Sequence, residues 1–88
     1  MMNEETARAE IKKWNDGIDR FIQNDLPKLL EAEGIKVTNG QIPMSCFFKA
    51  RAILDRQNFY EKGRALQMEL RAQGHDVKMD MQTDKLVF

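Results

Sequence analysis

The chain has 88 residues, of which 42% are hydrophobic and 32% are charged, a balance typical of a globular domain and not of a disordered chain. Its 14 basic and 14 acidic side chains give a formal net charge of zero. A net charge of zero counts against nucleic-acid binding, because proteins that bind phosphate backbones usually carry an excess of Lys and Arg. The length is that of one domain, so we expect residues 1–88 to form a single compact domain.

Cysteine content and hydropathy indicate the compartment. Cys46 is the only cysteine, which excludes an internal disulfide. Residues 1–5 lack the basic-then-apolar pattern of a signal peptide, and no apolar run approaches the roughly 20 residues that span a bilayer. We therefore expect a cytoplasmic protein that has no membrane association.

The N-terminal third has a helical pattern. Asn3 is placed to cap a helix, and apolar residues recur at spacings of three and four from Ala7 to Ile22. Pro27 removes a backbone donor and is tolerated only near a helix start. The pattern therefore predicts a break, after which Asp25 caps a short second helix that ends at Gly34.

Residues 35–42 have the pattern of a β-hairpin. Asn39 and Gly40 lie between two short β-branched runs, the strongest short-range signal for a tight hairpin turn. Pro43 would end the second strand or confine it to a sheet edge.

Two further helices are expected in the C-terminal half. Ser45 caps a helix over residues 46–56, and Asn58 with Glu61 resembles a capping box that begins a helix running to about Gln73. Gly63 falls on the inner face of this helix, where it would let another segment approach closely.

The tail alternates between apolar and polar residues, which predicts a half-buried strand paired with residues 85–88. The inward residues are expected to be Val77, Met79 and Met81, and a solvated face is expected for Asp76, Asp80 and Asp84. The resulting order α-α-β-β-α-α-β-β, about four helices packed with short antiparallel hairpins, predicts a small two-layer α+β domain.

The residues needed for catalysis are scarce. There is one histidine, one cysteine and one serine, and no glycine cluster that could cradle a phosphate. His75 follows the helix-ending Gly74, where it would interact with the last helix carbonyls, and Cys46 is interpreted as a small buried apolar residue. We expect no catalytic residue, no metal ligand, no cofactor and no enzymatic activity.

One face of the last predicted helix carries basic, amide and aromatic side chains. Tyr60, Arg64, Gln67 and Arg71 follow a 4, 3, 4 spacing, an arrangement that suits an acidic protein patch or a nucleic acid and equally suits an ordinary solvated face. Phe48 is adjacent to Phe47 and about 100° away around the helix, so one of the two leaves the core. The candidate partner-binding residues are Phe48, Lys49, Tyr60, Arg64, Gln67 and Arg71.

Two functions fit these observations. The first is a small protein-binding module, a regulator, inhibitor or adaptor of the kind found among phage or plasmid accessory proteins. An open strand edge at residues 86–88 would support it by inviting pairing, and a homodimer stays open. The alternative is a winged-helix nucleic-acid-binding regulator that uses the basic face of helix 59–73, with residues 77–88 as the wing.

Overall fold

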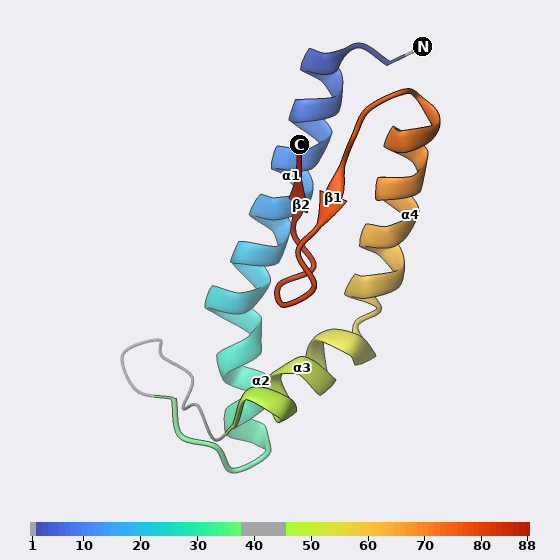
Figure 1. Cartoon of the computed structure of the whole chain (residues 1–88). Helices are drawn as coiled ribbons and strands as arrows, with labels where there is room; N and C mark the ends of the chain where they lie inside the picture. Colours follow the sequence, from blue (N-terminus) through green and yellow to red (C-terminus); the bar gives the residue numbers. More distant parts are fainter. Residues whose placement is uncertain (1, 38–45) are drawn as a thin grey trace.

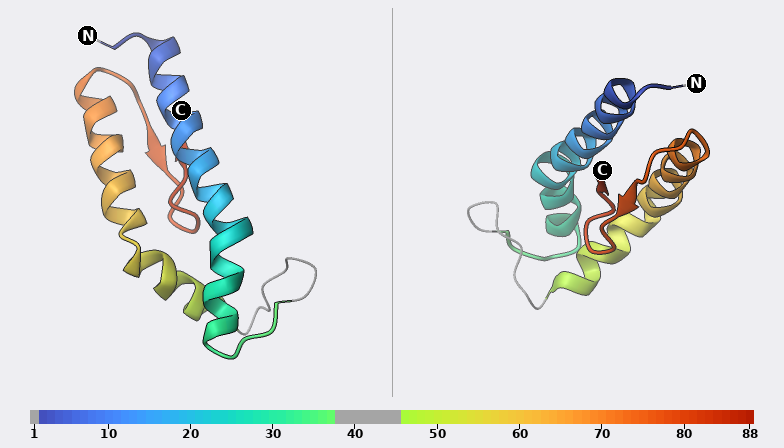
Figure 2. Two further views of the ribbon diagram at one scale, coloured as in Figure 1. Left: turned by 180° about the vertical axis from the view of Figure 1, so that it is seen from behind. Right: turned by 45° about the horizontal axis from the view of Figure 1, so that its top comes forward.

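The structure, a computed structural model, describes residues 2–37 and 46–88. A long N-terminal helix runs through α1 (Glu4–Arg20), the π-helical segment η1 (Phe21–Asp25) and α2 (Leu26–Ala32). Two helices follow, α3 (Phe47–Arg56) and α4 (Phe59–Ala72), and then the hairpin strands β1 (Lys78–Met79) and β2 (Leu86–Val87). The long helix and α4 form two arms that α3 joins at one end, and the hairpin lies between the arms (Figures 1 and 2).

The long helix corrects the predicted break before Pro27. The N–H of Leu26 donates to the carbonyl of Phe21, five residues earlier, so the backbone widens into a π-turn but stays helical. A wider turn relieves the clash between a proline ring and the carbonyl four residues before it. Asp25 has a helical backbone and no capping side-chain hydrogen bond, so its predicted role as a helix cap is wrong.

Two helices, α2 and α4, end at glycines that the sequence predicts as helix ends. Gly34 and Gly74 have positive φ angles of 82° and 91°. Each donates its N–H to the carbonyl three residues earlier, and the next residue donates to the carbonyl five residues earlier. This is the Schellman motif, which satisfies helix carbonyls that otherwise have no partner. Asn3 is also confirmed as a cap, because its Oδ1 accepts a 2.8 Å hydrogen bond from the N–H of Thr6.

The connection between α3 and α4 differs from the predicted capping box. Asn58 has a left-handed backbone (φ 61°), and its side chain makes no capping hydrogen bond. Only Gln57 and Asn58 separate the two helices, so the chain must change direction within two residues. Asn tolerates the left-handed conformation better than most residues, and at this position it serves the turn and not the cap.

The hairpin is shorter than the alternation predicted. β1 and β2 are antiparallel, with Lys78 opposite Val87 and Met79 opposite Leu86. Because β1 ends at Met79, Met81 falls in the turn and is 65% exposed, so its predicted inward position is wrong. Asp84 is also corrected, since it has a φ of 61° and is only 1% exposed. We therefore find a small α+β fold in which a two-stranded hairpin packs against helices.

Buried apolar residues form two clusters along an elongated molecule that measures 47 × 19 × 17 Å. One cluster joins α1, α4 and the hairpin through Ala7, Ile11, Leu70, Val77 and Leu86. The other joins α2 and α3 through Leu26, Leu30, Ala50 and Ile53.

The predicted hairpin over residues 35–42 and the predicted cap at Ser45 fall mainly outside the described residues. Ile35 and Val37 are described; they are not part of a strand, and they pack against the cluster between α2 and α3.

Candidate functional site

Three aromatic rings connect the two arms near the middle of the molecule. The ring centroid of Phe59, at the start of α4, lies 5.9 Å from Trp14 of α1 and 4.9 Å from Phe21 of η1. Gly63, one turn further along α4, allows Trp14 to lie close to α4 because glycine has no side chain. A Cβ at that position would lie 2.9 Å from Trp14 Cζ2 and 2.7 Å from Met79 Cε. The predicted close approach at Gly63 is confirmed.

Shallow hollows follow the seam between the long helix and the α3–α4 arm. The first, of about 320 Å³, has an apolar floor of Trp14, Phe59 and Leu66. The second, of about 300 Å³, begins at Phe21, whose ring contacts Phe59. The third, of about 240 Å³, shares Leu29 and Gln57 with the second and ends at Ile53. We call the three hollows together the seam groove; the contact between Phe21 and Phe59 separates the first hollow from the other two. The apolar residues of the groove are Trp14, Phe21, Leu29, Ile53, Phe59 and Leu66.

The seam groove and the hairpin lie on opposite sides of α1. Asn15 contacts β2, whereas Lys13 and Gly17 line the first hollow. Residues two positions apart on a helix point about 200° apart, so Lys13 and Gly17 face away from the strands. Trp14 lies between the two sides, because it lines the first hollow and also donates a hydrogen bond to the hairpin turn. Figure 2 shows that, seen from behind, the two arms lie in front of the hairpin.

Three cations on the long helix line the seam groove, namely Lys13 and Arg20 in the first hollow and Lys28 in the second. In the described part of the chain, none of them lies within 4.0 Å of a carboxylate. Glu10 and Asp25 are the acidic residues of the same two hollows, so cations are in excess. A groove with an apolar floor and an unpaired basic rim can bind a ligand that is apolar along one face and acidic beside it.

A fourth hollow, of about 390 Å³, lies between α1 and β2, but its charges are paired within α1. Arg8 binds Glu4 at 2.8 Å and places its guanidinium 4.3 Å from the ring centroid of Phe88. Lys12 binds Asp16 at 2.6 Å. This hollow therefore has fewer charged groups free to recognise a ligand than the seam groove.

Part of the basic, amide and aromatic face predicted on α4 holds the hairpin in place through hydrogen bonds. Gln67 is 3% exposed; its Nε2 donates to the carbonyl of Val77 at 3.0 Å, and its Oε1 accepts from Arg64 at 2.9 Å. Arg71 Nε donates to the same carbonyl at 3.1 Å. After Gly74 the chain returns along this side of α4, and the outward carbonyl of Val77 needs donors. The burial of Gln67 contradicts both interpretations of this residue, as a candidate partner-binding residue and as part of a solvated face.

The other predicted partner-binding residues lie on the surface. Phe48 is 84% exposed in the first turn of α3, Lys49 beside it is exposed, and Tyr60 is 39% exposed in the first turn of α4. Phe48 and Lys49 lie near the α2–α3 cluster, whereas Arg71 lies near the far end of α4. The six candidate residues therefore do not form one continuous surface.

The Asn15 side chain occupies the β2 edge of the hairpin at Leu86, which corrects the open strand edge expected there. On the β2 side, Asn15 Nδ2 donates to the carbonyl of Leu86 and Asn15 Oδ1 accepts from its N–H, both at 2.8 Å. On the other side, Gln67 and Arg71 occupy the carbonyl of Val77. The hairpin packs between two helices and does not project from the body as a wing would.

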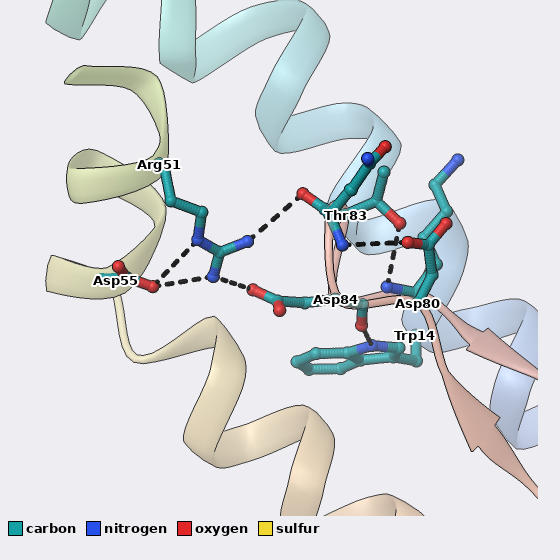
Figure 3. Close-up of polar contacts among 8 residues, drawn as sticks. Trp14, Arg51, Asp55, Asp80, Thr83 and Asp84 are labelled. Carbon is teal, nitrogen blue, oxygen red and sulfur yellow. Dashed lines mark hydrogen bonds and ion pairs between the residues drawn. The ribbon is translucent and has the colours of Figure 1, made fainter. Parts of the chain in front are cut away.

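A buried ion pair fixes the hairpin turn to α3 (Figure 3). Arg51 Nη2 lies 2.5 Å from Oδ2 of Asp84 and 2.7 Å from Oδ1 of Asp55. Burial by itself lowers the pKa of Arg51, but the hydrogen bonds to Asp55 and Asp84 outweigh it and raise that pKa above its ordinary value. Trp14 Nε1 donates to the carbonyl of Asp84 at 2.8 Å, so the turn also connects to the aromatic floor.

His75 and Cys46 lie at opposite ends of the molecule. His75 Nε2 is 3.0 Å from the carbonyl of Met2, and its ring packs against Phe88. The predicted interaction of its side chain with the last carbonyls of the helix is replaced by this contact with the N-terminal segment. Cys46 precedes α3, whose buried residues pack against α2. Within residues 2–37 and 46–88, no three His, Cys, Asp or Glu side chains are grouped so as to hold a metal ion.

None of the helices in the described part of the chain combines the length and the apolar character needed to cross a membrane. Comparison of the chain with protein-family models, with curated proteins and with solved structures found no match.

Proposed function

We propose that this chain is a cytoplasmic, non-enzymatic protein-binding module, a regulator, inhibitor or adaptor, and that it binds a segment of its partner protein in the seam groove. The observation that carries the proposal is the open apolar floor of the groove between two helical arms. Leu29 is 37% exposed there, and Trp14 and Phe59 are half-buried. Apolar side chains that line a depression release water when a partner covers them, which favours binding.

The groove is also held in shape without a partner. The rings of Trp14, Phe59 and Phe21 fix the spacing of the arms, and the hydrogen bond from Trp14 to Asp84 anchors the floor to the hairpin. A preorganised groove loses less conformational freedom on binding than a mobile surface does.

Capture from a lysate of the source cells, with and without nuclease and at two salt concentrations, tests the proposal. The expected result is a stoichiometric protein that survives nuclease treatment and moderate salt. Its capture should be lost with Leu29→Glu in the groove. It should persist with Met68→Glu, since Met68 is an apolar residue on α4, 51% exposed, that lines none of the three hollows.

Two outcomes would overturn the proposal. Equal capture by both variants would show that the partner binds elsewhere, and Arg64→Glu and Phe48→Ala would then test the surfaces that the sequence suggested. Recovery of nucleic acid that is released steeply as salt rises would favour the nucleic-acid-binding alternative.

A further inference from the structure

We infer that the ligand of the seam groove is an amphipathic α-helix of the partner protein, about 20 residues long, with acidic residues along one flank. This inference rests on the proposed function and specifies the chemistry of the partner.

The hairpin leaves little opportunity for the main alternative mode of peptide recognition, the addition of a strand to a sheet edge. Strand addition needs unpaired backbone groups along that edge. Asn15 already binds both backbone groups of Leu86, and Gln67 and Arg71 bind the carbonyl of Val77. The groove itself is walled by helices, and a helix laid between two helices is the arrangement in which apolar side chains at three- and four-residue spacing interdigitate.

The length of the ligand follows from the extent of the groove. On the long helix the hollows extend from Glu10 to Glu33. At 1.5 Å per residue this segment measures about 35 Å. A helix of about 20 residues spans about 30 Å and would therefore cover Trp14 at one end and Leu29 at the other.

The charge of the ligand follows from the basic rim. Lys13 and Arg20 are seven residues apart, which is about two turns of an α-helix. Arg20 and Lys28 are eight residues apart, but the wider π-turn at Phe21–Asp25 lies between them, so this spacing is also about two turns and keeps the three cations on the same side. Acidic residues at a similar spacing on a bound helix would face each of them in turn. Opposite charges at the edge of an interface select the partner and its register more than they raise affinity.

The inference is tested with three synthetic 21-residue peptides that share one pattern of leucines and differ only on the flank, which carries Glu, Gln or Lys. Trp14 is the only tryptophan, so its fluorescence reports directly on the first hollow. We expect the Glu peptide to shift the emission of Trp14, and to bind at least tenfold more tightly than the Lys peptide in low salt. Backbone amide NMR shifts should map to the groove, and a peptide with scrambled leucines should cause none.

Charge reversal supplies the decisive control. In the triple variant Lys13→Glu, Arg20→Glu, Lys28→Glu the preference should invert, so that the Lys peptide binds more tightly. The matched variant Lys36→Glu, Lys62→Glu, Lys78→Glu changes the net charge equally at exposed positions outside the groove and should keep the original preference.

Equal affinity for all three flanks, or an unchanged preference in the triple variant, would overturn the inference. The same result would leave the proposed function standing if Leu29→Glu still abolished capture of the cellular partner. Conversely, a failure of Leu29→Glu to affect that capture would overturn the proposed function whatever the peptides do.

Discussion

Asn15 binds the backbone of Leu86 as a neighbouring strand would: its carboxamide donates to the carbonyl and accepts from the N–H, with both hydrogen bonds at 2.8 Å. Because β2 is only two residues long, this side chain supplies a large part of its edge bonding. A helix side chain thereby fills the place that a third strand would take.

Replacing Asn15 by Leu should destabilise the protein by about 1–3 kcal/mol, because two backbone groups lose their partners in a partly buried site. Urea unfolding would measure the loss, and hydrogen exchange should show faster exchange at the Leu86 amide. Asn24→Ala, at an exposed position of the same long helix, should change stability by less than about 0.5 kcal/mol. Equal effects of the two substitutions would contradict the role assigned to Asn15.

Replacement by alanine should change the stability of the protein in opposite directions at Gly17 and Gly63, because the two glycines have different surroundings. At Gly17 the atom nearest to a new Cβ is Nη2 of Arg20 at 4.0 Å, so Gly17→Ala should stabilise the helix by about 0.5–1 kcal/mol. At Gly63 the new Cβ would overlap Trp14 and Met79, so Gly63→Ala should cost about 1–3 kcal/mol. Thermal unfolding of both variants is the measurement. A stabilised Gly63→Ala would mean that the arms are not held at the distance described.

The buried pair of Arg51 and Asp84 should be more costly to break than the exposed pair that Arg56, on the same helix, forms with Glu33. Arg51→Met leaves the carboxylate of Asp84, 1% exposed, without its partner and should cost about 2–4 kcal/mol. Arg56→Met removes a pair with Glu33 in which the Arg side chain is 63% exposed, and it should cost less than about 1 kcal/mol.

A double-mutant cycle separates the free energy of the Arg51–Asp84 ion pair from the cost of burying an unpaired carboxylate at Asp84. Asp84→Asn removes the charge and keeps a residue that tolerates the left-handed φ of 61°. Adding it to Arg51→Met should therefore recover part of the lost stability. If the double variant were less stable than Arg51→Met alone, burial of the unpaired carboxylate would not be the cause of the loss.

Asp16 should titrate at a lower pH than an unperturbed aspartate. Its hydrogen bond with Lys12, at 2.6 Å, lowers its pKa below the usual 3.8. A lowered pKa in the folded state means that the carboxylate contributes stability above pH 3.8 and that this contribution is lost as the pH falls through the folded pKa. A carboxyl NMR titration should show Lys12→Met returning the pKa of Asp16 toward 3.8, and Lys13→Met should have little effect. Equal shifts in both variants would exclude the hydrogen bond as the cause.

The candidate site could be predicted from the sequence only in part. The spacing of apolar residues from Ala7 to Ile22 placed Trp14 in a helical stripe, and Gly63 indicated a close approach of another segment. The incomplete burial of Trp14 depends on how far apart the arms lie, which helical periodicity does not encode. Gln67 and Arg71 had the spacing of a binding face, but their donors bind Val77, a residue that returns to them only when the hairpin packs against α4.

The amino-acid sequence by itself determined the features that depend on neighbouring residues. These are the helical stripes, the cap at Asn3, the glycines that end two helices, and the hairpin near the end of the chain, because capping, φ preference and side-chain alternation act within a few residues. The tertiary structure decided whether Pro27 breaks the helix or is absorbed by a π-turn, since the outcome depends on burying Leu26 and Leu30 against α3. It also decided the burial of Asp84 and the position of the groove, because contacts between residues distant in the sequence exist only once the helices and the hairpin have packed together.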